Sequence, residues 1–175
     1  DNEEYIKKAR FLATQARDNA PHYQHSHIGF NYRMSNICAG IGRGQMKVID
    51  ERVAQRRNNF LFYKNEFSKV EGITFVEEPK VHFSNRWLTT VIIDPQKTGG
   101  ITREDLRLSL EKENIESRPL WKPMHLQPIF SSAPFYGTDI SEKLFDDGLC
   151  LPSGSNLLPE ELDRIASIIH ETLKK

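Results

Sequence analysis

The sequence has no excess charge of either sign, almost no cysteine and no long hydrophobic run. Its 175 residues include 24 Lys and Arg against 24 Asp and Glu, so the formal net charge is zero. A chain without a basic or acidic excess offers no global field that would attract nucleic acid, an anionic membrane or another polyanion. We therefore expect neither nucleic acid nor a membrane as partner, and any recognition by charge must be local.

The usual sequence marks of membrane insertion and export are also lacking. No apolar run approaches the ~20 residues of a membrane-spanning helix, and the chain starts with Asp1-Asn2-Glu3-Glu4 rather than with basic residues. Cys38 and Cys150 are the only cysteines, and each stands beside apolar residues. This favours buried thiols over a disulfide framework or a metal site. Together these features predict a cytoplasmic protein.

The length of the chain fits one domain of ordinary size, with or without a projecting arm. Apolar residues at helical spacing predict a helix over 3–20, ended by Pro21, and a long helix over 35–70. Glycines inside the long helix, or Asp50, should interrupt it. We expect residues 1–70 to form a helical arm and interface segment, and residues 71–175 to form a small C-terminal domain.

Short apolar segments alternate with amphipathic ones in the second part of the chain. Strands are predicted over 73–76, 87–93, 115–120 and 148–152, and helices over 102–114 and 159–173. Thr102 starts the first of these helices with a capping-box pattern, and Pro159 starts the second at its N1 position. This order predicts an α+β fold in which helices flank a short mixed or antiparallel sheet.

Three motifs suggest site chemistry but fit it poorly. The loop His22-Tyr-Gln-His25-Ser-His27 holds three imidazoles, yet its spacing matches no standard zinc pair and it contains no cysteine or acidic ligand. Gly40-Ile-Gly42-Arg-Gly44 resembles a phosphate-binding loop, but its glycines lie inside a helical pattern, which favours close helix packing. The carboxylate pairs Glu77-Glu78 and Asp146-Asp147 are interpreted as surface turns. We therefore expect no metal site.

A polar cluster, Gly29-Phe-Asn31-Tyr-Arg33-Met-Ser35-Asn36, stands directly before the predicted long helix. Asn31 offers an amide donor and Arg33 a planar guanidinium, and both lie near a helix N-terminus, which favours anions. A structural interpretation is equally good, because Ser35 or Asn36 can cap the helix while Arg33 forms a surface ion pair. The residues alone leave both interpretations open.

A second cluster, residues 116–128, contains Arg118, Trp121, Lys122 and His125 between several prolines. The prolines restrict the backbone, and the cations and the indole are the equipment for binding a nucleotide or a diphosphate. A tryptophan flanked by prolines is also ordinary core material. The sequence shows no Ser/His/Asp or Cys/His arrangement for nucleophilic catalysis.

Together, these clusters resemble the DegT/DnrJ/EryC1/StrS family of sugar aminotransferases. The resemblance covers about residues 3–173 and is carried by the strings Asn31-Tyr-Arg-Met-Ser-Asn36, Gln55-Arg-Arg57, Pro123-Met-His-Leu-Gln-Pro128 and Gly148-Leu-Cys-Leu-Pro-Ser-Gly154. The string from Arg118 to His125 further resembles the branch that acts on UDP-4-keto-6-deoxy-N-acetylhexosamines, as in bacillosamine-type or surface-glycan synthesis.

The resemblance implies the small C-terminal domain of a fold-type I transferase that depends on pyridoxal phosphate. In that family a lysine holds the cofactor, which takes an amino group from glutamate and passes it to a nucleotide-linked keto sugar; the enzyme is a homodimer with shared active sites. Asn31 would then reach the cofactor phosphate across the dimer interface, and Arg33 would contact substrate or the glutamate carboxylate. Arg118, Trp121 and His125 would border the sugar-nucleotide pocket.

The chain departs from the family in its lysines. None stands in the Ser-rich, Gly-flanked setting of the family's cofactor lysine, which the resemblance places upstream of residue 1. A nucleophilic lysine also needs a desolvated or cation-flanked environment. We therefore expect no catalytic residue here and an inactive isolated chain. The leading hypothesis is a C-terminal portion of an aminotransferase. Alternatives are a non-catalytic nucleotide-sugar-binding or dimerisation domain, and a cleaved enzyme whose other half accompanies this chain.

Overall fold

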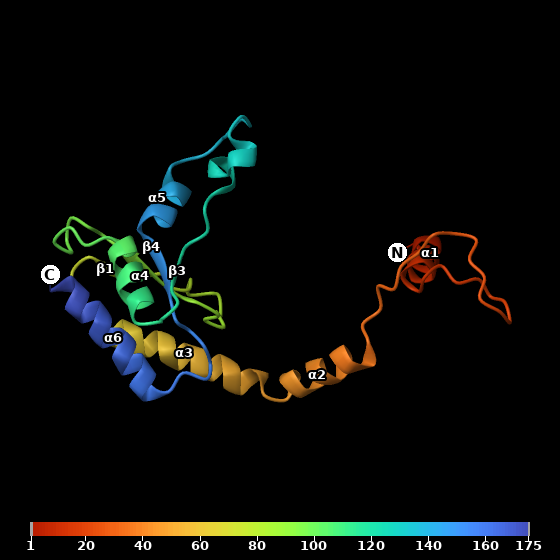
Figure 1. Ribbon diagram of the computed structural model, residues 1–175, viewed down its shortest axis with the longest axis horizontal. Coiled ribbons are helices and arrows are strands. Elements are labelled where there is room, and N and C mark those ends of the chain that lie inside the picture. Colours follow the sequence, from red (N-terminus) through yellow and green to blue (C-terminus); the bar gives the residue numbers. More distant parts are fainter. Residues whose placement is uncertain (1, 175) are drawn as a thin grey trace. The chain divides into compact units, whose positions relative to one another are not determined.

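The computed structural model describes residues 2–174 and divides the chain into two compact units, Asp1–Ile49 and Asp50–Lys175 (Figure 1). This division lies about one helix earlier than the boundary expected near residue 70. Helix α3 (Ile49–Glu66) belongs with the second unit because its Tyr63 is fully buried in the hydrophobic core of that unit.

Four short strands form the sheet of the second unit (Figure 1). They are β1 (Ile73–Phe75), β2 (Thr89–Ile93), β3 (Arg118–Pro119) and β4 (Gly148–Leu151). The strand order is β1-β2-β4-β3, and every neighbouring pair is antiparallel. All four predicted strands are confirmed, each shorter than predicted, and β2 lies inside the sheet between β1 and β4. The α+β fold is confirmed with an antiparallel sheet.

One face of the sheet carries the hydrophobic core. Thr89 pairs with Leu151, and Val91 with Leu149, and all four side chains are buried. Helices α3, α4 (Arg103–Lys112) and α6 (Pro159–Leu173) pack on this face through apolar side chains. These are Tyr63 of α3, Leu106 and Leu110 of α4, and Leu162, Ile165, Ala166 and Ile169 of α6. These three helices therefore cover one side of the sheet.

The opposite face of the sheet is formed by the alternate residues, because successive side chains of a strand point to opposite sides. Thr90 of β2 pairs with Cys150 of β4, which in turn pairs with Arg118 of β3. These three residues form a row across the strands. Cys150 is buried in this row, as predicted, whereas Cys38 is exposed in the first unit, so the prediction of a buried thiol is wrong for Cys38.

The helices of the core layer start at the residues that the sequence identifies. The Thr102 hydroxyl accepts the Asp105 backbone N–H at 3.2 Å, and the Asp105 carboxylate accepts the Thr102 N–H at 2.8 Å, which confirms the capping box. Pro159 opens α6, where its missing N–H leaves no helical hydrogen bond unmade. The Glu161 carboxylate accepts the Leu158 N–H at 2.8 Å. Local sequence therefore sets both starting points.

The first unit begins with helix α1 (Glu3–Ala13). The prediction of a helix over 3–20 is wrong because Gln15 and Ala16 adopt positive φ angles of 66° and 49°, which turn the chain out of the helix. The chain then returns, and Thr14 forms an isolated antiparallel bridge with Asn31. This turn, and not Pro21, ends the helix and brings the polar cluster beside its C-terminus.

The predicted long helix is in fact two helices. Helix α2 (Asn36–Met46) ends before α3 starts, so the predicted discontinuity is confirmed. Among the described residues, no further atom lies within 4 Å of the position that a Cβ would take at Gly40, Gly42 or Gly44. The close helix packing predicted for these glycines is therefore not found within residues 2–174.

Three short elements between β3 and β4 were not predicted. They are the 3-10 turns η1 (Met124–Leu126) and η2 (Pro128–Phe130) and helix α5 (Ile140–Asp147). Their short length gives no repeating apolar pattern long enough to identify from sequence. None of the helices within residues 2–174 has the length and apolar character needed to cross a membrane.

Candidate functional site

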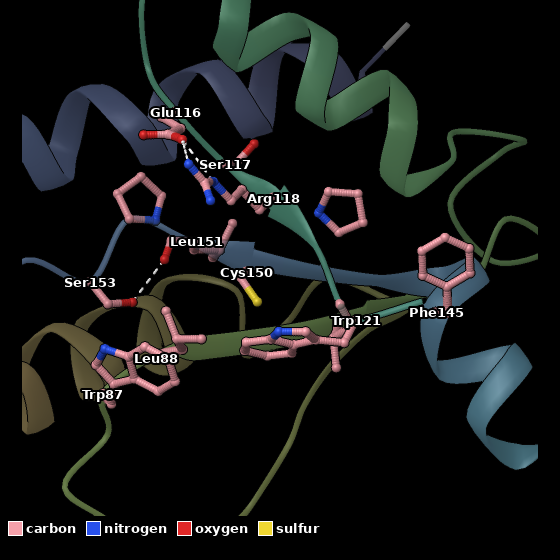
Figure 2. A pocket seen from close by; sticks show the side chains of 13 residues that line it. Trp87, Leu88, Glu116, Ser117, Arg118, Trp121, Phe145, Cys150, Leu151 and Ser153 are labelled. Carbon is pink, nitrogen blue, oxygen red and sulfur yellow. Dashed lines mark hydrogen bonds and ion pairs between the residues drawn. The ribbon is translucent and has the colours of Figure 1, made fainter. Parts of the chain in front are cut away.

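A pocket of about 590 Å³ opens within the second unit, beside the row formed by Cys150 and Arg118 (Figure 2). Its walls include Trp87, Trp121 and Phe145, and Cys150 lies at its base. This volume falls within the ~300–1,000 Å³ that is usual for small-molecule sites, which are mostly apolar with a few polar groups. The pocket brings together two of the substrate residues predicted from sequence, Arg118 and Trp121.

Trp87 and Trp121 lie side by side in the wall of this pocket (Figure 2). Their ring centroids are 6.1 Å apart, and their planes are inclined by 39°. Trp87 is 59% exposed and Trp121 is 65% exposed, so neither indole serves as core material within the described chain. The interpretation of Trp121 as an ordinary core residue is therefore wrong. Both indoles remain available for contact with a ligand.

Arg118 stands at the rim of the pocket and pairs with Glu116. Its Nε donates to Glu116 Oε1 at 2.7 Å, and one of its terminal nitrogens donates to the same oxygen. Both side chains are more than 70% exposed. Water screens so exposed a pair, so the two charges hold each other only weakly. An anionic ligand can therefore replace Glu116 at the guanidinium.

Two polar groups at the base of the pocket, the Cys150 thiol and the Ser153 hydroxyl, are not free for a ligand, and the Ser117 hydroxyl is buried without a hydrogen-bond partner among the described residues. Burial raises the pKa of the Cys150 thiol, which therefore stays protonated and apolar. The Ser153 hydroxyl accepts the Thr89 backbone N–H and donates to the Leu151 carbonyl, each at 2.8 Å. Only the rim thus offers free charge to a ligand, while the interior offers flat apolar surface.

The segment that carries Trp87 is held against helix α3 by an ion pair. Arg57 binds Glu78 through two hydrogen bonds, Nη2 to Oε1 at 2.8 Å and Nη1 to Oε2 at 3.1 Å. Glu78 also accepts the backbone N–H of Ser84. These hydrogen bonds to Arg57 and Ser84 lower the pKa of Glu78 to about 2. The interpretation of Glu78 as part of a surface turn is therefore wrong.

Arg86 adds a second anchor immediately before Trp87. Its side chain is 8% exposed, lies 3.6 Å from the centre of the Phe60 ring and donates to the Val76 carbonyl at 2.8 Å. These contacts hold Arg86 at a positive φ of 50°, a conformation that is costly for a residue with a Cβ. The Trp87 carbonyl accepts a hydrogen bond from Arg56 at 2.6 Å. The main chain of Trp87 is thus fixed, although its indole is exposed.

His125, the third predicted substrate residue, lies outside this pocket. Its Nε2 is 3.0 Å from Glu142 Oε1, and its ring stacks on Phe135 with centroids 3.7 Å apart. The structure therefore brings Arg118 and Trp121 together and places His125 at a separate position beside α5.

The polar cluster of the first unit precedes helix α2. The Ser35 hydroxyl accepts the Cys38 backbone N–H at 3.2 Å, so the N-cap interpretation is confirmed for Ser35. Asn31 Oδ1 accepts the Arg33 backbone N–H at 3.2 Å, which forms an Asx turn. The side-chain oxygen of Asn31 is therefore already hydrogen-bonded. Within residues 2–174 the Asn31 amide nitrogen has no partner and Arg33 forms no ion pair. Both side chains are exposed and available to an anion.

The first unit thus offers an amide nitrogen and a guanidinium before a helix, and the second unit by itself offers a pocket with two indoles and a rim arginine. A family model, the DegT/DnrJ/EryC1/StrS aminotransferase family, matches residues 1–170. The chain belongs to this family.

Individual relatives agree with the family match. EpsN of Bacillus subtilis, whose name describes a pyridoxal phosphate-dependent aminotransferase, is 49% identical over 173 residues, which are 97% of this chain and 44% of EpsN. GDP-perosamine synthase of Caulobacter vibrioides is 30% identical over 99% of this chain and 46% of its own length. The crystal structure of the aminotransferase TlmJ from Streptoalloteichus hindustanus matches with a TM-score of 0.81 and 20% identity, over 99% of this chain and 46% of TlmJ.

The chain spans about half the length of the curated relatives it matches. The likeness to TlmJ shows that its fold is that of part of an aminotransferase, which confirms the predicted fold class. Every lysine from Lys7 to Lys174 is exposed, and none has the desolvated setting that activates an amine. Nor do residues 2–174 contain a group of His, Cys, Asp or Glu side chains that could hold a metal ion.

Two residues of the pocket were missed from sequence. Trp87 was interpreted only as the start of a strand, although the polar run Ser84-Asn85-Arg86 before it indicates a loop rather than a core position. Glu116 was noted without a role, although its spacing from Arg118 places both side chains on one side of an extended segment. In each case the missing information was the pairing of β2, β4 and β3.

Proposed function

We propose that the chain is the C-terminal part of an aminotransferase that uses pyridoxal phosphate. It would transfer an amino group from glutamate to a nucleotide-linked 4-keto-6-deoxy sugar, in the synthesis of a surface polysaccharide or glycan. The observation that carries the proposal is the family match over residues 1–170. The relatives named for pyridoxal phosphate and for GDP-perosamine support it. The whole enzyme would be a cytoplasmic homodimer with shared active sites.

In this proposal the first unit binds the cofactor across the dimer interface. Pyridoxal phosphate, when bound, supplies the stabilisation of the carbanion. The Asx turn of Asn31 leaves its amide nitrogen as the free end, and that end can donate to a phosphate oxygen. Arg33 can pair with the carboxylate of substrate or of glutamate. The donor set of these two residues therefore fits anionic groups.

The second unit binds and orients the sugar nucleotide. Arg118 and Trp121 supply a cation and a flat apolar face at one pocket. His125 remains a predicted substrate residue, and because it lies outside this pocket it would contact another part of the substrate. None of the described lysines fits the role of holding the cofactor, so this portion alone would be inactive.

The complete reading frame provides the test. We expect the complete protein to bind pyridoxal phosphate, seen as a visible absorption band, and to convert glutamate to 2-oxoglutarate when a nucleotide-linked 4-keto sugar is supplied. The 175-residue chain alone should do neither. Failure of the complete protein to bind the cofactor would contradict the proposal.

A non-catalytic nucleotide-sugar-binding or dimerisation domain is the second candidate. The pocket is lined entirely by residues of the second unit, which favours this candidate because binding would then require no other part of the protein. It predicts that calorimetry detects UDP-sugar binding by the complete protein, with no cofactor bound and no amino transfer. Measuring both activities in one preparation separates the two candidates.

A further inference from the structure

The sequence contains two tryptophans, Trp87 and Trp121, and both stand in the wall of the same pocket. They are far apart in the chain and meet because β4 pairs with both β2 and β3. An indole left mostly in water forgoes the stabilisation that burial of its large apolar surface would give. Two such indoles gathered at one concave site indicate a surface kept free for a ligand.

The backbones that carry the two indoles are held in place. The Trp87 carbonyl accepts the Arg56 guanidinium, and the Trp87 N–H donates to Asn85 Oδ1 at 3.0 Å. Trp121 stands between Pro119 and Pro123, whose rings fix their φ angles. Figure 2 shows the indoles side by side, with the Cys150 sulfur directed toward Trp121. The fold therefore holds the backbone at both tryptophans in place, while the exposed indole rings can still rotate.

The lining of the pocket favours one class of ligand. A sugar ring carries several hydroxyl groups that would lose water in the pocket, yet the Ser153 hydroxyl is already committed, the Ser117 hydroxyl is buried and Cys150 is a weak donor. A flat heteroaromatic ring instead gains contact with the indole faces and loses little hydration. Arg118, whose guanidinium is exposed, lines the same pocket and can pair with a phosphate.

We propose that Trp87 and Trp121 bind the nucleobase of a nucleotide, with its phosphate at Arg118 in place of Glu116. This inference rests on the proposed function, because a nucleotide-linked sugar carries both groups, and it adds Trp87 and Glu116 to the site. The two indoles lie side by side, with centroids 6.1 Å apart and planes inclined by 39° (Figure 2). Together they offer one broad apolar surface against which a flat ring can pack.

Intrinsic fluorescence tests the proposal directly, because both tryptophans of the 175-residue chain lie in the pocket. UDP, uridine and inorganic pyrophosphate are titrated separately. We expect UDP to change the emission at the lowest concentration, uridine to produce the same change at higher concentration, and pyrophosphate to produce little change. Calorimetry on the complete protein measures the same affinities without depending on the isolated chain.

Four variants separate the contributions of ring and phosphate. Trp87→Ala should weaken UDP about 10- to 100-fold, as expected for the loss of one base–aromatic contact, while Trp87→Phe should retain most of the affinity. Arg118→Gln should weaken UDP but not uridine, and Glu116→Gln should strengthen UDP but not uridine. Tyr136→Ala is the matched control, because it removes an exposed ring outside the pocket and should change no affinity.

Several results would overturn the proposal. These are equal affinity for pyrophosphate and UDP, unchanged UDP binding by Trp87→Ala in the complete protein, a response to N-acetylglucosamine but not to uridine, or emission that depends only on protein concentration. The last would indicate an interface between copies of the chain. No readout involves the cofactor or turnover, so nucleotide binding without amino transfer would contradict the proposed function alone. Amino transfer with UDP affinity unchanged by Trp87→Ala would contradict this inference alone.

Discussion

Arg57 and Glu78 join helix α3 to the segment before Trp87 by two hydrogen bonds of 2.8 and 3.1 Å. The hydrogen bonds to the carboxylate lower the pKa of Glu78 to about 2, from an ordinary value of 4.5. A carboxylate whose pKa is lower in the folded state stabilises the fold above its unfolded pKa. That contribution is lost as the pH falls from about 4.5 toward 2. We therefore expect Glu78→Gln to destabilise the chain at neutral pH.

The pH dependence distinguishes this pair from a general loss of stability. The difference in urea midpoint between the wild type and Glu78→Gln should be largest near neutral pH and should shrink as the pH falls from about 4.5 toward 2, where the Glu78 carboxyl takes up its proton. Glu71→Gln serves as control, because Glu71 is exposed and has no ion-pair partner within residues 2–174. A difference that stays constant with pH would show that the charge of Glu78 does not contribute.

The capping box of α4 makes a second prediction about stability. Thr102→Ala removes the hydroxyl that accepts the Asp105 N–H, so the free energy of unfolding should fall by about 1 kcal/mol, the usual cost of losing an N-cap. Thr102→Ser keeps this acceptor and should remain close to the wild type. Urea unfolding of the three proteins measures the effect. Equal losses in both variants would assign the role of Thr102 to its methyl group instead.

Leu149 tests the core on the helix side of the sheet. It is fully buried in β4, and Leu149→Ala should lower the free energy of unfolding by about 2–5 kcal/mol, because it removes buried contacts and leaves a cavity. Leu108→Ala on α4 removes the same atoms from a side chain that is 41% exposed, and should cost about 0.5 kcal/mol or less. Similar losses of stability in both variants would contradict the burial of Leu149 and the exposure of Leu108.

The elements that the sequence predicted are those with a local cause. Thr102 and Pro159 mark helix starts through hydrogen bonds or φ angles set within a few residues. The early end of α1 has no such mark, because Gln15 and Ala16 take positive φ angles that their residue types do not favour. Tertiary contacts hold that turn, and Ala16 at its centre is fully buried.

The candidate site was predictable only in part, because part of it depends on contacts between segments that are far apart in the sequence. The resemblance to a family pointed to Arg118 and Trp121, and the structure places both at one pocket. The meeting of Trp87 with Trp121 depends on the register of β2 with β4 and of β4 with β3, which involves long-range pairing. His125 shares a sequence string with Trp121 but lies in the 3-10 turn η1, outside the pocket.

The two cysteines should differ in reactivity. Burial raises the pKa of Cys150, which is only 6% exposed, so little thiolate forms there. Cys38 is exposed. We expect a thiol reagent such as DTNB to label the folded chain rapidly at one position, and the rapid phase to disappear in Cys38→Ser but persist in Cys150→Ser. Two rapid phases in the wild type would show that the base of the pocket opens in solution.

Asn31 allows its structural and ligand roles to be separated by one pair of substitutions. Its Oδ1 accepts the Arg33 N–H, whereas its amide nitrogen is the end proposed to donate to the cofactor phosphate. Asn31→Asp keeps the acceptor but replaces the donor with a negative oxygen, and Asn31→Ala removes both. If the turn alone matters, Asn31→Asp should be the milder change. If the nitrogen binds phosphate, Asn31→Asp should be the more severe, because two anions repel each other.

We expect the second outcome when the affinity of the complete protein for pyridoxal phosphate is measured by absorption. Asn31→Ala should weaken binding about tenfold or more, as expected for the loss of a hydrogen bond to a charged group, and Asn31→Asp should weaken it further. Asn19→Ala removes an exposed amide of the same unit and should leave the affinity unchanged. Because Asn31→Asp preserves the Asx turn, a wild-type affinity in that variant would show that Asn31 shapes the loop and does not contact the phosphate.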